Sequence, residues 1–342
     1  MIDMPFSKGV NFSKWFETVK LEEVVFEKFT ESDFANVKKL GADVVRIPIA
    51  FHNYTLGDNV HTINPELFKY IDCAVDWAEK HQVYIIIDNH SFHPVNPTEP
   101  DIDKILIPVW QQIASRYKNR SKYVIYEILN EPHKIDDGLW GRIQGDAINA
   151  IRKIDDIHTI IVGGTEYNSI LKLFEIPEYN DDNLIYTFHF YDPHIFTHQG
   201  AAWNKPSLAP LSNLAFPFDK NTLPKELHES FKDTWVEDAL NSYENDSKLE
   251  KLNATLDKIL EFSKKRSVPV FCGEFGVYMV QSPAESRVNW YKFICNALEK
   301  RKISWACWDY YGSFGVFKTS KYGSSFPSEL NMDIIRAMGF EI

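Results

Sequence analysis

Two glutamates, Glu131 and Glu274, each follow a short apolar run that is typical of a buried strand. Glu131 lies near the end of VIYEILNEP, Glu274 follows VPVFCG, and proline or glycine comes soon after each glutamate. If both runs are parallel strands of one barrel, their carboxyl ends open on the same face, so the two carboxylates can meet. One carboxyl group can then protonate a leaving oxygen while the other acts as base or nucleophile, which is the chemistry that glycoside hydrolysis requires.

Further polar or aromatic side chains stand at or near the ends of predicted strands. They are Arg46, His90, Asn130, His189, Tyr191 and Trp308. Each has an ordinary explanation when taken alone. A histidine in an apolar run is usually a hydrogen-bonded core residue, and a charged arginine there can belong to a buried salt bridge. Their gathering on one rim, with nothing comparable on the opposite rim, indicates a functional site.

The chemistry suggests a role for several of these side chains. One carboxyl group must keep its proton near neutral pH while the other stays ionised, so their surroundings must differ. Arg46, if it lies beside Glu274, would hold that carboxylate charged, and Glu131, with fewer cations near it, could carry the proton. Asn130 could donate a hydrogen bond to a sugar 2-hydroxyl, and Trp308 offers an apolar face to the sugar.

The order of the predicted elements gives the fold class. Predicted strands begin near residues 8, 43, 83, 123, 159 and 184, and helices between most of them complete a repeated βα unit. The predicted helices cover residues 32–41, with Ser32 as N-cap, 65–82, 101–117, 139–154, 248–265, 284–300 and 328–338, with a weaker helical signal at 225–243.

The repeat stops at residue 192 and resumes after residue 246 with two more strands, at 268–273 and 303–310. We therefore expect an α/β protein whose residues 1–342 form a single (β/α)8 TIM barrel and catalytic domain. Residues 192–246 are expected to form a small, mostly helical subdomain in the loop after strand 6, over the C-terminal face of the barrel. Trp203 in this insertion is a candidate platform for a sugar ring.

Composition limits the class of protein. Hydrophobic residues make up 44% of the chain and charged residues 25%, which is ordinary for a folded protein with a sizeable core. The net charge of −11 argues against nucleic acid as a partner, because its phosphates would be repelled. The four cysteines (Cys73, Cys272, Cys295 and Cys307) have no Cys-x-x-Cys spacing, so we expect buried hydrophobic residues and neither disulfides nor metal ligands.

Other catalytic chemistries have weaker support in the sequence. Asp88, His90 and His93 lie close together and could bind a metal, but this spacing is nonspecific and no further ligand is tied to it. There is no Gly-x-Ser-x-Gly motif for a nucleophilic serine and no glycine-rich loop for phosphate. We expect no metal and no cofactor.

The motifs together resemble glycoside hydrolase family 5, the large cellulase family of clan A. The resemblance covers essentially the whole chain, in order, through RIP at Arg46, DNH at His90, LNEP at Glu131, HFYDP at His189, GEFG at Glu274 and the segment around Trp308. The stretch 190–203, FYDPHIFTHQGAAW, further resembles the clostridial endoglucanase C type of this family, in which the loop after strand 6 grows into a small helical subdomain.

This resemblance implies a (β/α)8 barrel that hydrolyses internal bonds of β-1,4-glucan with retention, as in cellulose or mixed-linkage glucan. It implies that Glu131 is the acid/base and Glu274 the nucleophile, with the Tyr191 hydroxyl beside the nucleophile. The other residues that bind the sugar at the cleaved bond would be Arg46, His90, Asn130, His189 and Trp308. Related family members act on mannan or on other β-glucans, so those substrates are the main alternatives.

The expected partner is thus a β-linked polysaccharide or oligosaccharide, and neither nucleic acid nor a membrane. A barrel that binds carbohydrate without cleaving it is the alternative from another class, and turnover would distinguish the two. We expect a monomer. The start of the chain lacks the apolar region of a signal peptide and no run of about 18 apolar residues occurs, so the protein would be extracellular if an export signal has been removed and cytoplasmic otherwise.

Overall fold

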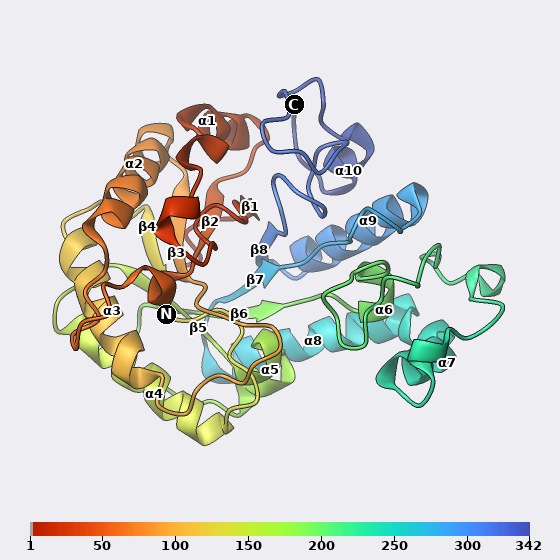
Figure 1. Ribbon diagram of the computed structural model, residues 1–342, viewed down its shortest axis with the longest axis horizontal. Helices are drawn as coiled ribbons and strands as arrows, with labels where there is room; N and C mark the ends of the chain where they lie inside the picture. The colour runs from red at the N-terminus through yellow and green to blue at the C-terminus, as the bar shows by residue number, and fades with distance from the viewer. Residues whose placement is uncertain (1–2) are drawn as a thin grey trace.

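Eight parallel strands form a closed barrel in the computed structural model, which describes residues 3–342. The strands are β1 (Lys8–Asn11), β2 (Val44–Ile49), β3 (Tyr84–Asn89), β4 (Val124–Glu127), β5 (Thr159–Gly163), β6 (Leu184–His189), β7 (Val270–Glu274) and β8 (Ser304–Cys307). They follow one another in chain order, and β8 closes the ring against β1 (Figure 1). The predicted (β/α)8 barrel is confirmed, although the first two residues of the expected domain 1–342 lie outside the described part.

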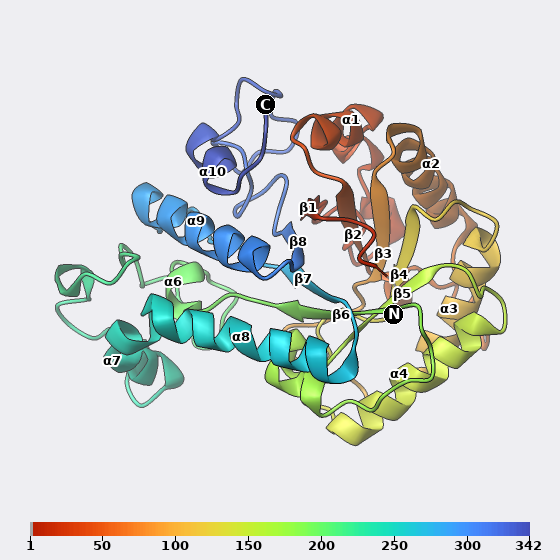
Figure 2. The ribbon, with the colours of Figure 1, turned by 180° about the vertical axis from the view of Figure 1, so that it is seen from behind.

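Helices follow the strands along the chain. They are α1 (Glu31–Lys39), α2 (Pro65–His81), α3 (Asp103–Tyr117), α4 (Asp137–Arg152), the short α5 (Thr165–Asn168) and α6 (His194–Thr197), α7 (Trp235–Asp246), α8 (Leu249–Arg266), α9 (Ala284–Lys300) and α10 (Met332–Ala337). Figures 1 and 2 show α1 to α4 along one side of the barrel and α8 to α10 along the other. Among residues 3–342, no helix has both the length and the apolar character needed to cross a membrane.

Helix boundaries depart from the predictions where a polar side chain caps the helix elsewhere. The expected N-cap Ser32 is wrong, because Thr30 takes that position and its backbone N–H donates to the Asp33 carboxylate at 2.8 Å. The last helix begins at Met332 instead of residue 328, since the Asn331 side chain accepts the Ile334 N–H. Helix α9 has the predicted bounds, 284–300.

The interior of the barrel is layered because side chains alternate between the two faces of each strand. One layer is apolar and is closed from below by Phe6. Its members on the strands are Val44, Ile86, Ile125, Ile161, Ile185, Phe271 and Ala306. Two residues further along their strands stand the buried Arg46, Asp88 and Glu127, which therefore face the interior nearer to the carboxyl ends. The alternation thus places charged groups above the apolar layer.

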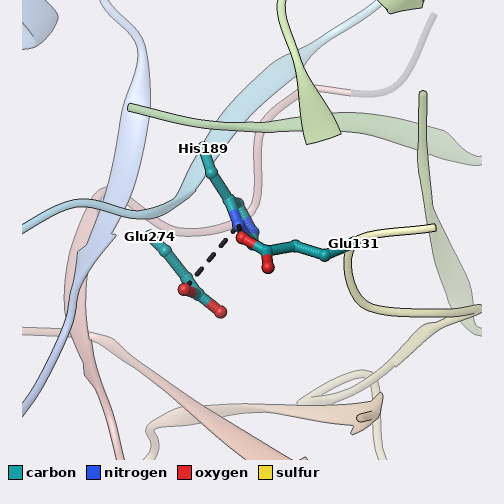
Figure 3. Close-up of side chains that lie close together, drawn as sticks. All are labelled: Glu131, His189 and Glu274. Carbon is teal, nitrogen blue, oxygen red and sulfur yellow. Dashed lines mark hydrogen bonds and ion pairs between the residues drawn. The ribbon is translucent and has the colours of Figure 1, made fainter. Parts of the chain in front are cut away.

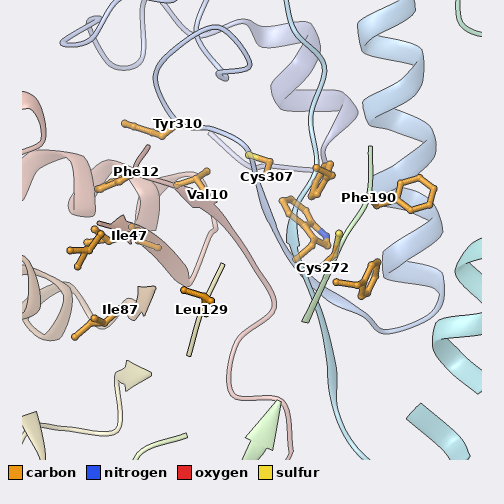
Figure 4. Packing of buried hydrophobic residues seen from close by; sticks show 14 of the residues in the cluster. Val10, Phe12, Ile47, Ile87, Leu129, Phe190, Cys272, Cys307 and Tyr310 are labelled. Atoms are coloured by element: carbon orange, nitrogen blue, oxygen red, sulfur yellow. The ribbon is translucent and has the colours of Figure 1, made fainter. Parts of the chain in front are cut away.

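The residues between these interior positions point outward and pack against the helices in a second, larger cluster. Figure 4 labels several of them, including Ile47, Ile87, Cys272 and Cys307. Full burial of a side chain of isoleucine size stabilises a fold by about 1.5–3 kcal/mol, so this shell holds the strands to the helices. Cys272, Cys295 and Cys307 are free and buried, and Cys73 is half-buried, so they occupy places of small apolar side chains.

Residues 192–246 lie between β6 and α8 and contain α6, α7 and two short 3-10 turns joined by long loops. Figures 1 and 2 show α6 and α7 beside α8 and α9, at one end of the molecule. Trp235 anchors α7 to the preceding loop because its indole N–H donates to the Lys205 carbonyl at 2.9 Å. The insertion also lines the cavity at the mouth of the barrel, through His194, Trp203 and Trp235.

Candidate active site

The carboxylates of Glu131 and Glu274 meet at the mouth of the barrel, on either side of His189 (Figure 3). One oxygen of each glutamate and one nitrogen of the histidine all lie within 4.8 Å of one another. Glu131 follows β4, whereas His189 ends β6 and Glu274 ends β7, where an irregularity in the register sets these two residues side by side. His189 Nδ1 lies 2.6 Å from Glu131 Oε1 and 3.7 Å from Glu274 Oε2.

Arg46 lies at the centre of the site, completely buried inside the barrel. Its guanidinium lies 2.7 Å from Glu274 Oε1, 2.7 Å from Glu127 Oε2 and 3.0 Å from Asp88 Oδ2. Burial alone would lower the pKa of Arg46, but these carboxylates raise it well above its usual value, so the cation persists. Both sequence interpretations of Arg46 therefore hold: it pairs in buried salt bridges, and it also contacts Glu274.

Two partners of Arg46 were missed in the sequence. Asn11 accepts a hydrogen bond from Arg46 Nη1 at 2.9 Å, and Glu127 accepts one from Nε at 2.7 Å and one from Nη2 at 3.0 Å. Burial raises the pKa of Glu127, and the adjacent Arg46 opposes that rise. A signal existed for Glu127, because it interrupts an apolar strand as Arg46 does. Nothing comparable marked Asn11, which is the last residue of the short strand β1.

The surroundings of Glu131 favour its protonated form. Only 14% of its side chain is exposed, and burial raises its pKa to about 7, while the positive charges of His90 and Arg46 limit the rise. Burial lowers the pKa of His189 to about 4, so the imidazole beside Glu131 is neutral at neutral pH. Glu131 is therefore poised to hold and release a proton near pH 7.

The surroundings of Glu274 favour its ionised form. Arg46 donates to one of its oxygens, and the Tyr191 hydroxyl donates to the other at 3.0 Å. Burial, together with the nearby charge of Glu274, raises the pKa of Tyr191 well above its usual value, so the phenol keeps the proton that it donates. Two hydrogen bonds, one from a cation, thus stabilise negative charge on Glu274.

The remaining predicted residues lie around this pair. Asn130 accepts a hydrogen bond from Arg46 Nη2 at 2.8 Å, and its Nδ2 lies 3.3 Å from His90 Nε2. His90 Nδ1 lies 2.7 Å from Asp88, and the His90 ring stacks on Trp308 with 5.8 Å between ring centroids. Asn130, His90 and Trp308 thus form one connected group beside the two glutamates.

Trp203 lies in the insertion and not in this inner group. Its side chain is 46% exposed and contacts Tyr278 edge-on, with ring centroids 5.0 Å apart. It nevertheless lines the same cavity, which has a volume of about 1850 Å³. Its lining includes Lys14 and Glu17 in the loop after β1, both glutamates, and Trp203 and Trp235 in the insertion.

The alternative metal site at Asp88, His90 and His93 is not assembled. Asp88 is paired with Arg46 and His90, while His93 Nδ1 accepts backbone N–H groups of its own turn, from Val95 and Asn96. Over residues 3–342, the one His and carboxylate group whose ligand atoms converge closely enough for a metal is the trio Glu131, His189 and Glu274.

Comparison with known proteins gives consistent matches. The family model described as cellulase (glycosyl hydrolase family 5) matches residues 7–313. Endoglucanase C of Acetivibrio thermocellus is 28% identical over 316 residues, which cover 89% of this chain and 91% of that protein. Endoglucanase 3 of Fibrobacter succinogenes is 30% identical over 341 residues, which cover 92% of this chain and 51% of that protein.

Solved structures match over nearly the whole chain. Endoglucanase Cel5A of Thermotoga maritima superposes with a TM-score of 0.78 at 28% identity, covering 97% of this chain and 96% of that one. Structures of that endoglucanase include complexes with cellobiose and with mannotriose. The cellulose synthase subunit Z of Clostridioides difficile gives a TM-score of 0.79 at 28% identity, with 97% and 99% coverage.

Proposed function

The chain belongs to glycosyl hydrolase family 5, the cellulase family, and we propose that it is a retaining endo-β-1,4-glucanase with Glu131 as acid/base and Glu274 as nucleophile. The observation that carries this proposal is the close approach of two carboxyl groups in opposite electrostatic surroundings. Burial favours the proton on Glu131, whereas Arg46 and Tyr191 favour the charge on Glu274. An acid and a nucleophile are thus available at the same pH.

The separation of the two groups supports retention. Carboxyl groups of retaining enzymes lie about 5–5.5 Å apart, whereas inverting enzymes leave about 6.5–9.5 Å for a water molecule. The nearest oxygens of Glu131 and Glu274 lie within 4.8 Å here, too close for a water molecule and a sugar carbon to fit between them. Direct attack by Glu274 on the anomeric carbon fits this spacing.

In the first step, a Glu274 oxygen attacks the anomeric carbon while the bond to the leaving glycosidic oxygen breaks. Glu131 transfers its proton to that oxygen, so one sugar chain leaves as an alcohol and the other remains as an ester of Glu274. Arg46 and Tyr191 orient Glu274 for attack. Because positive charge develops at the anomeric carbon, a hydrogen bond from a neighbouring group to the 2-hydroxyl strengthens in the transition state.

In the second step, Glu131 is a carboxylate and acts as base. It removes a proton from water, whose oxygen attacks the anomeric carbon and displaces Glu274 with its bonding electron pair. The sugar then has its original configuration, Glu131 has regained its proton and Glu274 its charge. His189, neutral and within 2.6 Å of Glu131, supports both protonation states of that group.

The shape of the cavity supports internal cleavage. Besides both glutamates, its lining includes residues of the loop after β1, of the loop after β3 and of the insertion. A polysaccharide can therefore lie across the catalytic pair with sugars bound on both sides. Trp203 and Trp235, 46% and 39% exposed, offer aromatic faces at the insertion end. The substrate class follows from relatives described as endoglucanases, and the mannotriose complex of Thermotoga maritima Cel5A keeps β-mannan as the second candidate.

The test is the release of reducing sugar from carboxymethylcellulose, lichenan, glucomannan and pure β-mannan, together with the loss of viscosity of carboxymethylcellulose. We expect release from the glucans and an early fall in viscosity, because internal cuts shorten the polymer quickly. Release mainly from β-mannan would leave the proposed mechanism standing but show that the proposed substrate is wrong. No release from any of the four would contradict the enzyme and support a binding barrel.

The acid role of Glu131 predicts both the pH profile and the effect of the leaving group. Because only the protonated carboxyl group can donate, kcat/KM on cellotetraose should fall as the pH rises through about 7. Glu131→Ala should lower kcat/KM on cellotetraose by about 10²–10⁴-fold. The rate of the first step on a 2,4-dinitrophenyl glycoside should fall much less in this variant, since the leaving group needs no proton.

The control is Glu261→Ala, which removes an exposed glutamate from α8, away from the cavity. It should leave kcat/KM on both substrates, and the pH profile, unchanged. Equal losses on cellotetraose and on the dinitrophenyl glycoside in Glu131→Ala would contradict the acid role.

A further inference from the structure

A buried amide outside the predicted site contacts the histidine that holds Glu131. Asn168 is fully buried at the end of α5, and its Nδ2 lies 3.3 Å from His189 Nε2. The other ring nitrogen, Nδ1, lies 2.6 Å from Glu131 Oε1. Asn168, His189 and Glu131 therefore form a continuous chain of polar contacts that ends at the cavity.

One tautomer of His189 satisfies both of these contacts. An amide nitrogen can only donate, so Nε2 beside Asn168 must accept and carries no proton. A Glu131 oxygen without a proton can only accept, so Nδ1 donates to Oε1 when Glu131 is ionised or carries its proton on the other oxygen. Because burial lowers the pKa of His189, the ring is neutral and has a single proton to place.

The amide and the ring fit because β5 ends in Gly163 and β7 carries Gly273 next to its last residue. A Cβ atom added at Gly163 would lie 2.4 Å from Asn168 Oδ1, and one added at Gly273 would lie 3.2 Å from His189 Nε2. Any side chain at Gly163 would thus displace the amide. Gly163 thus leaves the room that the Asn168 amide occupies, and Gly273 leaves room for the His189 ring.

The backbone that carries Asn168 is anchored to the loop of Glu131. Glu166, Tyr167 and Asn168 have φ values of 50°, 63° and 55°, a left-handed conformation that residues other than glycine rarely adopt in succession. The Tyr167 N–H donates to the Pro132 carbonyl at 3.3 Å, and the Lys134 N–H donates to Glu166 Oε1 at 2.9 Å. This unusual turn therefore sets Asn168 at a defined place relative to Glu131.

We propose that Asn168 is a positioning residue that holds His189 in the tautomer with its proton on Nδ1 and thereby keeps the acid proton of Glu131 on the oxygen facing the cavity. This inference rests on the proposed function. With Nδ1 donating, Glu131 Oε1 is occupied as an acceptor, and the carboxyl proton stays on the second oxygen, which points away from His189 (Figure 3). In the other tautomer, the carboxyl proton would turn toward Nδ1 and away from the substrate.

Other charged groups also act on His189. They are Glu131 after β4, Glu274 on β7, Arg46 on β2, Asp88 on β3 and His90 after β3. Glu131 and Glu274 lie near Nδ1, whereas Asn168 contacts Nε2. A substitution at Asn168 therefore changes the partner of Nε2 and leaves these groups in place.

The direct test is the tautomer of His189 in the unaltered protein. In ¹⁵N-histidine-labelled protein, the His189 signals are assigned through their loss in His189→Gln, and two-bond ¹H–¹⁵N correlations report which nitrogen is protonated. We expect a protonated Nδ1 and an unprotonated Nε2 at pH 7. A protonated Nε2 would overturn the proposal. Since this measurement involves no turnover, its failure would leave the proposed function standing.

The kinetic test compares Asn168→Asp with Asn168→Gly. The aspartate keeps the shape of the side chain but can only accept, which favours a proton on Nε2. We expect kcat/KM on cellotetraose to fall by about tenfold or more, while that on a 2,4-dinitrophenyl cellobioside falls by less than about threefold. Asn168→Gly, which suits a positive φ, should show the same selectivity with a smaller loss.

Asn213→Asp is the matched control, because Asn213 also has a positive φ, 61°, but is exposed in the insertion and does not line the cavity. This variant should leave kcat/KM on both substrates unchanged. If the two Asn168 variants lost activity equally on both substrates, Asn168 would have only a structural role and the proposal would be wrong.

Discussion

Replacing Glu274 by glutamine is expected to lower turnover of β-1,4-glucans by about 10⁴-fold, which corresponds to about 5 kcal/mol in activation free energy. The amide cannot form the ester that the double displacement requires, since it lacks the negative charge of the nucleophile. The fold should survive, because glutamine has the same shape and Arg46 keeps its pairs with Glu127 and Asp88. Reducing-sugar release from carboxymethylcellulose measures the effect, and circular dichroism checks the fold.

Azide distinguishes the two glutamates in a single experiment. With Glu274→Gly and a 2,4-dinitrophenyl glycoside, azide should enter the empty place of the nucleophile and give the α-glycosyl azide. With Glu131→Ala, azide should attack the ester on Glu274 and give the β-glycosyl azide. The opposite stereochemistry in the two variants would exchange the assigned roles, and more than about a tenth of wild-type turnover in Glu274→Gln would refute the nucleophile.

Replacing Arg46 by methionine is expected to cost about 3–5 kcal/mol of stability and most of the activity. Its removal leaves Asp88, Glu127 and Glu274 buried without their cation, within one polar layer of the barrel. Arg46 then no longer opposes the rise that burial causes in the pKa of Glu127, so this carboxyl group binds its proton more tightly in the folded than in the unfolded chain. Stability should therefore be lost as the pH rises, and urea unfolding should show a larger loss at pH 8 than at pH 5.

Arg116→Met is the matched control. Arg116 pairs with Asp72 on the surface, where its side chain is 44% exposed. Exposed ion pairs contribute about 0–1 kcal/mol, so this variant should unfold within that range of the wild type at both pH values. A similarly small and pH-independent loss in Arg46→Met would contradict the view that Arg46 compensates the buried carboxylates.

The rhythm of strands and helices was predictable because it depends on local periodicity. Apolar runs recur with helices between them, and sequence alone identified all eight strands to within a few residues. Helix ends were less predictable, since the choice of N-cap depends on which polar side chain reaches a free N–H. Thr30 takes the N-cap position in place of Ser32, because the Asp33 carboxylate accepts a hydrogen bond from the Thr30 N–H.

Part of the site was missed because its contacts cross the barrel. Glu127 and Asn11 reach Arg46 from other strands, and Asn168 reaches His189 from an unusual left-handed turn. Such pairs depend on barrel closure, on the register between strands and on backbone angles that no short motif reports. The sequence contained the residues but not their distances.

The sequence by itself determined which side chains stand at the mouth of the barrel. Alternation along a strand decides which residues face the interior, and the carboxyl ends of parallel strands open on one face, so Arg46, Glu131, His189 and Glu274 were predicted to share a rim. Only the tertiary structure decided how protons and charges are distributed among them. Burial raises the pKa of Glu131 and lowers that of His189, whereas Arg46 and Tyr191 stabilise the charge of Glu274. These effects depend on how the whole barrel excludes water and where it sets each neighbour, so they exist only in the folded chain.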